Sequence, residues 1–546
     1  MMNDSNERKR KISVTSESCP YLDTVNRSAL DFDLEPSCSI SLESGPHIYG
    51  CLVCGKFLRG RGKKTPAYTH SVEEGHFIFI HLQKGTFHCL PDDYLVHDTS
   101  LSDIAAALHP TFQNDQIVNI DARHDLNRDL FGRRYLPGFV GLNNLQKTDY
   151  VNATVQALAH VKPLRDFFLQ NNHNHGTKEQ SPLVMAFGDL VRKLWSDQRF
   201  KAHVDPHLLL QAISVASKKR FNIGHQAEAG EFISWFLHQL HLGLGGDRNK
   251  SKSSIIHTTF QGKVQVTTKQ AKMVLPNKID PQQDDRAGSD DETEYNHEVD
   301  KKEPLHILEE TTMNTKFLLL TLDIPEKPLY KDDEGGLVIP QEPLVNVLKK
   351  FDGISFSDAL SKHGAAQQKR YRLIQLPNYL ILHLARFKTN QYSKEKNSTI
   401  VPFPLKHLDL TKYVYRPTPE QLNAMTIPEL QQLLMTSYGK SKITKSTNKE
   451  ELVRIALELM TQSLPDMLAN KYDLVANITH DSPADVGREG KIDPLQEGSY
   501  KCHVQHKGTG QWYAMQDLHV QETMPQLIGL SESYVLIFER KQDLIK

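Results

Sequence analysis

"GLNNLQKTDYVNATVQAL", residues 141–158, is typical of a loop that leads into the first turn of an enzyme's catalytic helix. Asp149 and Tyr150 stand where such a helix would carry a nucleophile followed by an aromatic residue. Two alternatives follow. Either the chain uses an unusual nucleophile, or it keeps a catalytic fold that no longer performs chemistry.

Size and composition indicate a multidomain globular protein. The chain has 546 residues and a net charge of −1, and at roughly 100–200 residues per domain this length predicts two to four domains. No apolar run approaches the roughly 20 residues needed to span a bilayer, so we expect no membrane partner. The balanced charge gives no global preference for nucleic acid, and any such argument must rest on local charge.

The N-terminal tail, residues 1–16, is expected to be disordered. It lacks the apolar segment of a secretory signal. Its four consecutive basic residues are read either as a nuclear localisation signal or as part of a solvated tail: Arg8, Lys9, Arg10 and Lys11.

Cysteine spacing predicts one structural zinc ion within residues 17–115. Cys51 and Cys54 form a C-x-x-C pair, and His70 and His76 follow. Two thiolates and two imidazoles can complete a tetrahedral zinc shell. Gly55, directly after the second cysteine, permits the tight backbone turn that such a pair needs.

A second metal site in the same region is a weaker alternative. Its candidate ligands include no second C-x-x-C pair: Cys19, Cys38, Cys89, His81 and His88. For the three cysteines, we expect buried free thiols instead.

A linker is expected at 116–136 and a large domain at 137–541. Helical patterns such as "EFISWFLHQLHLGL" precede strand patterns such as "NYLILHLARF", and this order predicts an α+β fold. Residues 276–304 are acidic and nearly free of apolar side chains. We therefore expect a disordered loop there, with an acidic interaction site as the alternative.

A second insertion, 416–468, predicts two short helices joined by a Lys-rich loop. Apolar residues recur at helical spacing along each of them: Ile427, Leu430 and Leu434 in the first, Leu452, Ile455 and Leu459 in the second. Thr426 and Asn448 are the expected caps. The pattern resembles the SAP module, which often binds nucleic acid. The alternative is a helical hairpin that only packs on the domain.

The large region resembles the ubiquitin-specific protease family, whose nucleophile box reads roughly "GLxNLGNTCYMNSxLQxL". Further segments match the other boxes of that family: "HQAEAGEF", "LIQLPNYLILHLARF", "NSTIVPFP" and "EGSYKCHVQHKGTGQWYAMQDLHV". The earlier Cys/His-rich region resembles the zinc finger of ubiquitin proteases. The resemblance implies a small zinc finger followed by a papain-like domain of the cysteine-protease superfamily.

The catalytic positions are altered in this chain. Carried over by the motifs, the nucleophile falls on Asp149, the histidine on Ser499 and the orienting residue on Gln516, with Asp517 beside it. Asn144 matches the residue associated with the oxyanion hole. A carboxylate is a weak nucleophile toward an amide, and a serine hydroxyl cannot act as a base near neutral pH. Loss of even one triad member typically costs on the order of 10⁴–10⁶ in rate.

Three other residues are candidates to replace the lost groups. His503 shares a strand face with Ser499 but is displaced by about 13 Å, while Cys502 falls on the opposite face. His480 is expected to be structural. We therefore predict no catalytic residue in this domain.

The chain combines a one-zinc finger with a protease-like domain that has Asp149 and Ser499 at the catalytic positions. Among proteins of this family, this combination resembles the inactive, spliceosome-associated members. That resemblance implies a non-enzymatic nuclear factor for pre-mRNA splicing that helps to assemble or stabilise the tri-snRNP. Its expected partners are tri-snRNP proteins, with snRNA and ubiquitin as further candidates. Two alternatives stay open, a ubiquitin-binding reader and an active deubiquitinase with an unforeseen nucleophile.

Overall fold

The structure is a computed structural model. It describes residues 19–170, 181–250, 252–274, 305–326, 330–331, 337–360, 366–389, 394–415, 417–438, 448–462, 470–482 and 493–541. The predicted disordered tail and the predicted acidic loop lie outside these residues. Within them, no helix is long and apolar enough to cross a membrane.

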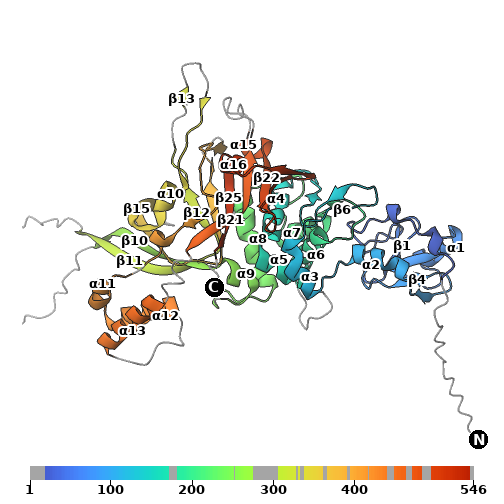
Figure 1. Ribbon diagram of the computed structural model, residues 1–546, viewed down its shortest axis with the longest axis horizontal. Helices are drawn as coiled ribbons and strands as arrows, with labels where there is room; N and C mark the ends of the chain where they lie inside the picture. The colour runs from blue at the N-terminus through green and yellow to red at the C-terminus, as the bar shows by residue number, and fades with distance from the viewer. Residues whose placement is uncertain are drawn as a thin grey trace, which may run out of the picture.

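The N-terminal domain lies at one end of the elongated molecule, at the right in Figure 1. Its sheet has the order β2-β1-β3-β4-β5 and is antiparallel throughout. The strands are short: β1 (Ile48–Cys51), β2 (Phe57–Arg59), β3 (Ile78–His81), β4 (Phe87–Cys89) and β5 (Tyr94–Val96). The helices α1 (Pro66–Glu73) and α2 (Ser102–Leu108) accompany this sheet.

The predicted linker is folded onto the large domain. It contains α3 (Asn114–Asn119) and the hairpin of β6 (Asn127–Arg128) and β7 (Arg134–Tyr135). Ile117, Ile120 and Tyr135 belong to the large domain's hydrophobic core. The connection between the domains is therefore a packed segment with its own secondary structure.

The large domain is built around a twisted sheet of the order β12-β17-β25-β21-β22-β23-β24, with β20 beside β21. Its strands come from distant parts of the chain: β12 (Leu320–Asp323), β17 (Tyr379–Ala385), β20 (Leu408–Asp409), β21 (Lys471–Asp481), β22 (Ser499–Gln505), β23 (Trp512–Gln516), β24 (His519–Thr523) and β25 (Ser533–Arg540). Alternate residues face two cores. Val535 and Ile537 pack with the helices, whereas Leu536 and Phe538 pack on the opposite side.

Helices form the layer on the first side of this sheet. They are α4 (Asp149–Ala159), α5 (Lys162–Gln170), α6 (Pro182–Trp195), α7 (His207–Ala216), α8 (Ala229–Gly243) and α9 (Ile255–Phe260). All residues of α4 are buried, which makes this helix the centre of the layer. It packs directly against β22.

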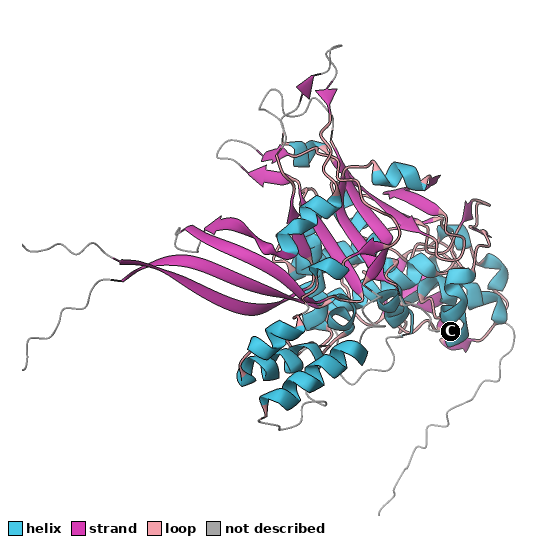
Figure 2. Ribbon diagram, turned by 60° about the vertical axis from the view of Figure 1, so that its left-hand side comes forward, coloured by secondary structure: helices cyan, strands magenta, loops and turns pink. Residues whose placement is uncertain are grey.

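A second sheet projects from the body, as Figure 2 shows at the left. Its order is β11-β10-β16-β15, and we call it the finger sheet. Its strands are long: β10 (Gly262–Val274), β11 (Leu305–Phe317), β15 (Asp352–Leu360) and β16 (Ala366–Gln375). No cysteine lies between Cys89 and Cys502. The base of the sheet instead packs Val264 and Leu373 against Phe351 in the second core.

Short elements complete the large domain. Two-stranded pairs join β8 (Gly141–Leu142) to β9 (His203–Val204), β13 (Tyr330–Lys331) to β14 (Leu337–Val338), and β18 (Phe387–Thr389) to β19 (Lys394–Lys396). The short helices are α10 (Leu344–Val347), α15 (Pro494–Glu497) and α16 (Pro525–Gly529).

Within its described residues, the insertion at 416–468 contains three helices, which lie beside the finger sheet (Figure 2). They are α11 (Pro419–Ala424), α12 (Ile427–Tyr438) and α13 (Lys449–Gln462). Leu430, Leu434 and Leu452 form a small separate core with Leu422 of α11, which sequence patterning missed. The backbone N–H of Glu450 donates to Asn448, as expected of a cap. The Lys-rich loop lies outside the described residues.

An ion-pair network joins the two domains. Asp33 of the N-terminal domain accepts from Lys193 Nζ at 2.7 Å and from the backbone N–H of Asp205 at 3.1 Å. Asp31 pairs with Lys201 at 2.5 Å. Although burial raises the pKa of Asp33, the charge and hydrogen bond of Lys193 hold it below its usual value. The network therefore favours one fixed arrangement of the domains.

We expect Asp33→Asn to lower the free energy of unfolding at pH 7 by about 1–3 kcal/mol, because a charged hydrogen bond across the interface is lost. Since the folded-state pKa of Asp33 is depressed, this contribution is present above the unfolded value of about 3.9 and is lost as the pH falls through the folded value. Urea unfolding at pH 7 and at lower pH measures both effects. Asp31→Asn, in a more exposed pair, is the matched control and should cost less than half as much. Equal losses of unfolding free energy in the two variants would contradict the larger contribution that we assign to Asp33.

Candidate functional site

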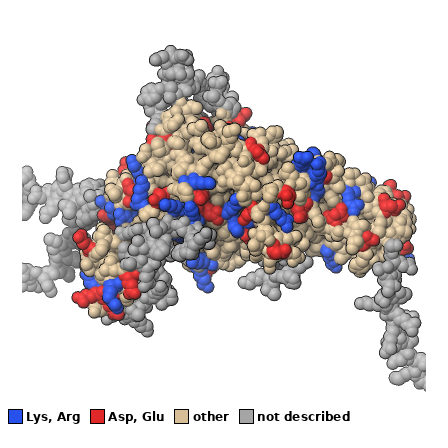
Figure 3. Space-filling view, viewed as in Figure 1, with Lys and Arg blue, Asp and Glu red and all other residues tan. Residues whose placement is uncertain are grey.

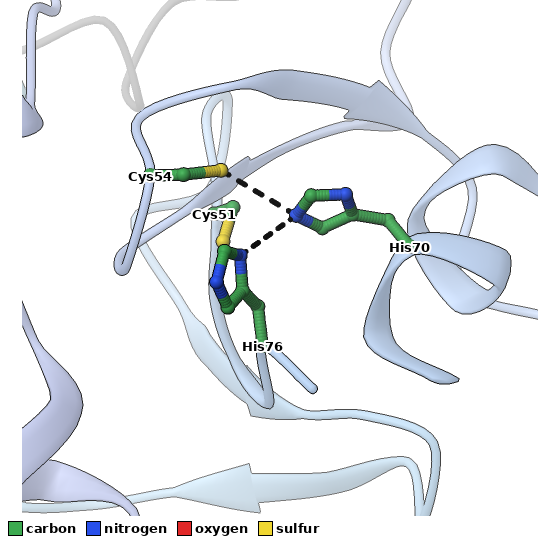
Figure 4. Close-up of side chains that lie close together, drawn as sticks. All are labelled: Cys51, Cys54, His70 and His76. Atoms are coloured by element: carbon green, nitrogen blue, oxygen red, sulfur yellow. Dashed lines mark hydrogen bonds between the residues drawn. The ribbon is translucent and has the colours of Figure 1, made fainter. Parts of the chain in front are cut away.

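The four predicted zinc ligands come together in the N-terminal domain (Figure 4). Their ligand atoms all lie within 4.8 Å of one another. His70 Nε2 lies 3.4 Å from Cys54 Sγ and 3.1 Å from His76 Nδ1. Cys51 ends β1, and His70 projects from α1, so secondary structure fixes half of the cluster.

This donor set fits zinc. With zinc–nitrogen bonds of about 2.0–2.1 Å and zinc–sulfur bonds of about 2.3 Å, neighbouring donors of a tetrahedron lie about 3.3–3.8 Å apart. The distances in the cluster are close to those values. Gly55 has φ +77°, and a Cβ there would lie 2.0 Å from the carbonyl oxygen of Ala29, so only glycine fits this turn. A bound zinc ion would cross-link β1, α1 and the segment before β3.

The weaker metal-site candidates do not form a second cluster among the described residues. Cys19, Cys38 and Cys89 are buried. Tyr94 donates its hydroxyl to Cys19 Sγ at 3.4 Å, and Cys38 Sγ accepts the backbone N–H of Arg59 at 3.3 Å. These contacts agree with the interpretation of the three cysteines as buried free thiols.

The described residues contain one further group of possible metal ligands, Asp31, Asp33 and Asp205. Two of its carboxylates pair with Lys193 and Lys201 in the network between the domains. These ion pairs account for the cluster without a metal.

We expect Cys54→Ser to abolish zinc binding, since the four-ligand shell loses one of its two thiolates and keeps only three ligands. Elemental analysis of the purified chain by mass spectrometry should fall from about one zinc per chain, the value expected for a single four-ligand site, to near zero. Cys89→Ser removes a buried thiol outside the cluster and should keep its zinc. Retention of zinc by Cys54→Ser would show that these residues are not the ligands.

The positions that the family motifs give to the catalytic groups also lie together, around the start of α4. Asp149 is 4% exposed. Its Oδ2 accepts the backbone N–H of Tyr500 at 2.7 Å and Nε2 of Gln226 at 3.1 Å. Burial, above all, raises the pKa of Asp149, and the neighbouring charge of Asp517 adds to the effect. Asp149 therefore links the first turn of α4 to β22.

The remaining positions are joined by hydrogen bonds. Gln516 donates from Nε2 to Ser499 Oγ at 3.1 Å. Asp517 accepts from Nδ2 of Asn144 at 3.0 Å and from Nδ2 of Asn152 at 2.8 Å. The loop before α4, α4 itself and the β23–β24 turn thus meet at one carboxylate.

Local backbone geometry explains why these segments approach so closely. Asp517 has φ +51°, and Leu142 donates its N–H to the Asp517 carbonyl oxygen at 2.9 Å. A Cβ at Gly141 would lie 2.7 Å from the backbone of Leu518. Gly141 is therefore required for β8 to pass close to the turn between β23 and β24.

The candidate replacement groups are buried and carry strongly shifted pKa values. Burial lowers the pKa of His503 to about 4 and that of His480 to about 3, so both are neutral at pH 7. Burial raises the pKa of the Cys502 thiol well above its usual value. Cys502 pairs with Ile478 in the sheet, and its side chain belongs to the first core. Cys502 is therefore a protonated thiol at pH 7, and the two buried imidazoles are weaker bases than an exposed histidine.

The chemistry open to this arrangement is limited. A carboxylate that already accepts two hydrogen bonds is a poor nucleophile toward an amide, and Ser499 offers no base. Asn144, which the family motif associates with the oxyanion hole, donates to Asp517. Sequence reasoning missed the roles of Gln226 and Asn152, although both lie in the motifs that carried the resemblance. Only their hydrogen-bond partners show what they do.

Comparison with known proteins identifies the family of each domain. Residues 140–538 match the family described as "Ubiquitin carboxyl-terminal hydrolase". The chain belongs to this family. Residues 38–101 match "Zn-finger in ubiquitin-hydrolases and other protein". The predicted fold class, a zinc finger followed by an α+β protease-like domain, is thus confirmed.

Two relatives of this hydrolase-family chain match it along most of its length. "Ubiquitin carboxyl-terminal hydrolase 39" of Mus musculus is 41% identical over 99% of this chain and 82% of its own length. "Probable mRNA-splicing protein ubp10" of Schizosaccharomyces pombe is 33% identical over 95% of this chain and 88% of its own length.

A solved structure described as "Crystal structure of an essential yeast splicing factor" shares the fold. It has a TM-score of 0.64 and 22% sequence identity, and the match covers 96% of this chain and all of that one.

We expect Asp149→Asn to raise the free energy of unfolding at pH 7 by roughly 1 kcal/mol, the usual size of a single polar substitution. The amide oxygen can accept both hydrogen bonds without a buried charge. Because the folded-state pKa of Asp149 is raised, the wild type becomes less stable as the pH rises from the unfolded value toward the folded one. The gain should therefore shrink below about pH 4. Urea unfolding at pH 7 and below about pH 4 measures this gain in the free energy of unfolding. Asp149→Ala removes the oxygen that accepts both hydrogen bonds, so this variant should instead be destabilised.

Proposed function

We propose that this protein is a non-enzymatic pre-mRNA splicing factor that acts in the nucleus. In this proposal its inactive protease fold is a scaffold that helps to assemble or stabilise the spliceosomal tri-snRNP. Its partners are tri-snRNP proteins, and contact with snRNA is part of the proposal.

The relative from Schizosaccharomyces pombe carries this proposal. That protein is named as an mRNA-splicing protein, and it matches 95% of this chain at 33% identity. The match spans both domains, so it concerns the whole arrangement of zinc finger and protease-like domain. The fold shared with the yeast splicing factor is in keeping with it.

The altered centre supports the absence of enzymatic activity. Asp149 and Ser499 stand at the nucleophile and histidine positions that the family motifs indicate. Asp149 is buried and satisfied by two donors. A protein that acts by binding does not need a reactive group there, and a buried hydrogen-bonded carboxylate adds rigidity instead. The zinc finger, with one structural ion, would belong to the same scaffold.

A ubiquitin-binding reader is the second candidate. The observation in its favour is that the match to the hydrolase family extends over residues 140–538, nearly the whole large domain. Such a reader would bind ubiquitin without cleaving it.

Depletion and rescue of splicing test the main proposal. Nuclear extract depleted of the protein should lose pre-mRNA splicing, and recombinant wild type should restore it. Asp149→Asn should restore it equally, because no chemistry at this position is required. Tri-snRNP proteins should co-purify with the tagged chain. Full splicing in depleted extract, or failure of the folded Asp149→Asn protein to rescue, would contradict the proposal.

A ubiquitin probe with a C-terminal electrophile tests the absence of catalysis. We expect no covalent capture of the purified chain, since neither Asp149 nor Ser499 can attack the probe as a thiolate would. An active ubiquitin-specific protease treated in parallel is the positive control. Capture that Asp149→Asn or Ser499→Ala abolishes would establish an active deubiquitinase. Binding of unmodified ubiquitin without capture would favour the reader.

A further inference from the structure

The central sheet of the large domain ends in a strand with a free edge. β24 is the last strand of the order β12-β17-β25-β21-β22-β23-β24, and among the described strands it pairs with β23 alone. Within the described part of the chain, no hydrogen bond joins its outer backbone groups to another segment. All five of its residues are exposed or half-buried. Such an edge can accept a further strand from another chain.

The hairpin of β23 and β24 indicates which backbone groups point outward. Its turn has two residues, and Gln516 lies opposite His519 where the strands begin. The pair that closes such a turn is hydrogen-bonded, and from there hydrogen-bonded and non-hydrogen-bonded pairs alternate along the ladder. Val520 and Glu522 therefore occupy non-hydrogen-bonded pairs, and their N–H and C=O groups point to the free edge.

A groove of about 560 Å³ lies between this edge and the β6–β7 hairpin. Val520 and Glu522 line it from β24, and Leu126 and Arg134 line it from the hairpin segment. The volume falls within the range of about 300–1,000 Å³ that is typical of binding pockets. The groove therefore offers space for a peptide backbone alongside β24.

Apolar side chains are exposed along the groove. Leu518, in the turn before β24, is 54% exposed and Leu126 is 56% exposed, and both line the groove together with the half-buried Val520. Their burial by a partner is favourable because apolar surface is removed from water. Side chains of a strand alternate between two faces, so every second side chain of an added strand would enter the groove. We expect apolar residues at those positions.

The charges at the groove indicate the polar part of the partner. Arg133 is paired with the buried Asp129 at 2.9 Å, whereas Arg134 is exposed and has no acidic partner among the described residues. Figure 3 shows Lys and Arg side chains gathered where Figure 1 places β6. A carboxylate on the partner would form a charged hydrogen bond with Arg134. Glu522, on the other side of the groove, disfavours a partner that is acidic throughout.

A second copy of this chain fits the edge less well. β24 has the sequence HVQET, in which Glu522 is the one carboxylate and Lys and Arg do not occur. Two antiparallel copies of β24 therefore bring no Glu opposite a Lys or Arg. Opposite charges across neighbouring strands are the pairs that would stabilise such a contact, and a different chain can supply them.

We propose that the free edge of β24 and this groove bind an extended segment of a partner protein as an added β-strand. The segment carries an acidic residue for Arg134 and apolar residues for Leu126 and Leu518. Backbone hydrogen bonds at Val520 and Glu522 supply affinity, and the side chains in the groove supply specificity. That the natural partner is a splicing protein rests on the proposed function, whereas the site rests on the edge and the groove.

A library of random short peptides displayed on phage and selected on the purified full chain supplies the probe. We expect the enriched peptides to share an acidic residue among apolar and β-branched ones. Fluorescence anisotropy with one such labelled peptide then measures affinity. Arg134→Glu should weaken binding by about 10-fold or more, because a charged hydrogen bond is replaced by repulsion. Arg128→Glu, an exposed residue of the same hairpin outside the groove lining, is the matched control and should weaken it less than about threefold.

Two substitutions of Glu522 separate strand addition from contact through side chains alone. Glu522→Pro removes the outward N–H, which an edge strand tolerates because the sheet does not use that donor. Relative to Glu522→Gln, it should weaken peptide binding by roughly fivefold, the effect of one lost hydrogen bond. Hydrogen–deuterium exchange of the β24 amides should also become slower when the peptide binds. If Glu522→Pro does not fold, the exchange measurement and Arg134→Glu decide the question.

Several outcomes would overturn the proposal. They are the absence of enriched peptides, equal effects of Arg134→Glu and Arg128→Glu, and unchanged exchange of β24 in the complex. Light scattering after size-exclusion chromatography should find a monomer, and a dimer that Glu522→Pro dissociates would assign the edge to a second copy instead. None of these measurements uses splicing extract, so this proposal and the proposed function fail separately.

Discussion

The carboxylate of Asp517 is the contact on which the altered centre depends. It holds Asn144 in the loop before α4 and Asn152 within that helix. Its own conformation, with φ +51°, forms the turn between β23 and β24. Hydrogen bonds to an ionised acceptor are about twice as strong as neutral ones. The arrangement of the loop, the helix and the sheet is therefore kept without the catalytic groups.

Ion pairs join the N-terminal domain to the large domain, in addition to the covalent connection between them. Asp33 and Lys193 form a nearly buried pair, with side-chain exposures of 14% and 15%. The value of such a pair lies in the geometry it specifies, because a misplaced partner would leave a buried charge unpaired. In the proposed splicing scaffold, this pair would hold the two domains in one fixed relation. The packed α3 and β6–β7 segment contributes to the same end.

The sequence predicted the features that depend on local spacing. Cys51, Cys54, His70 and His76 could be grouped because a C-x-x-C turn and two histidines have few other uses. The strand "NYLILHLARF" and the altered catalytic positions followed from motifs. Contacts between distant segments were beyond such reasoning, and they include Gln226 to Asp149 and Asp33 to Lys193. The cross-strand Lys263–Lys316 pair could not be predicted either, because the sequence of one strand alone does not determine the register of the finger sheet.

The loop before α4 follows an unusual backbone path next to the position that the family motif gives to the nucleophile. Gln146 and Lys147 have φ values of +68° and +51°, a conformation that costs a residue with a Cβ about 1–2 kcal/mol. The family box carries Gly-Asn at these two positions, and those residues adopt it more readily. The loop keeps its path because Asn144 accepts the N–H of Thr148 and Leu145 donates to the Thr148 hydroxyl. Asp149 then accepts the N–H of Tyr500, so the position that the family motif gives to the nucleophile joins the helix to the sheet.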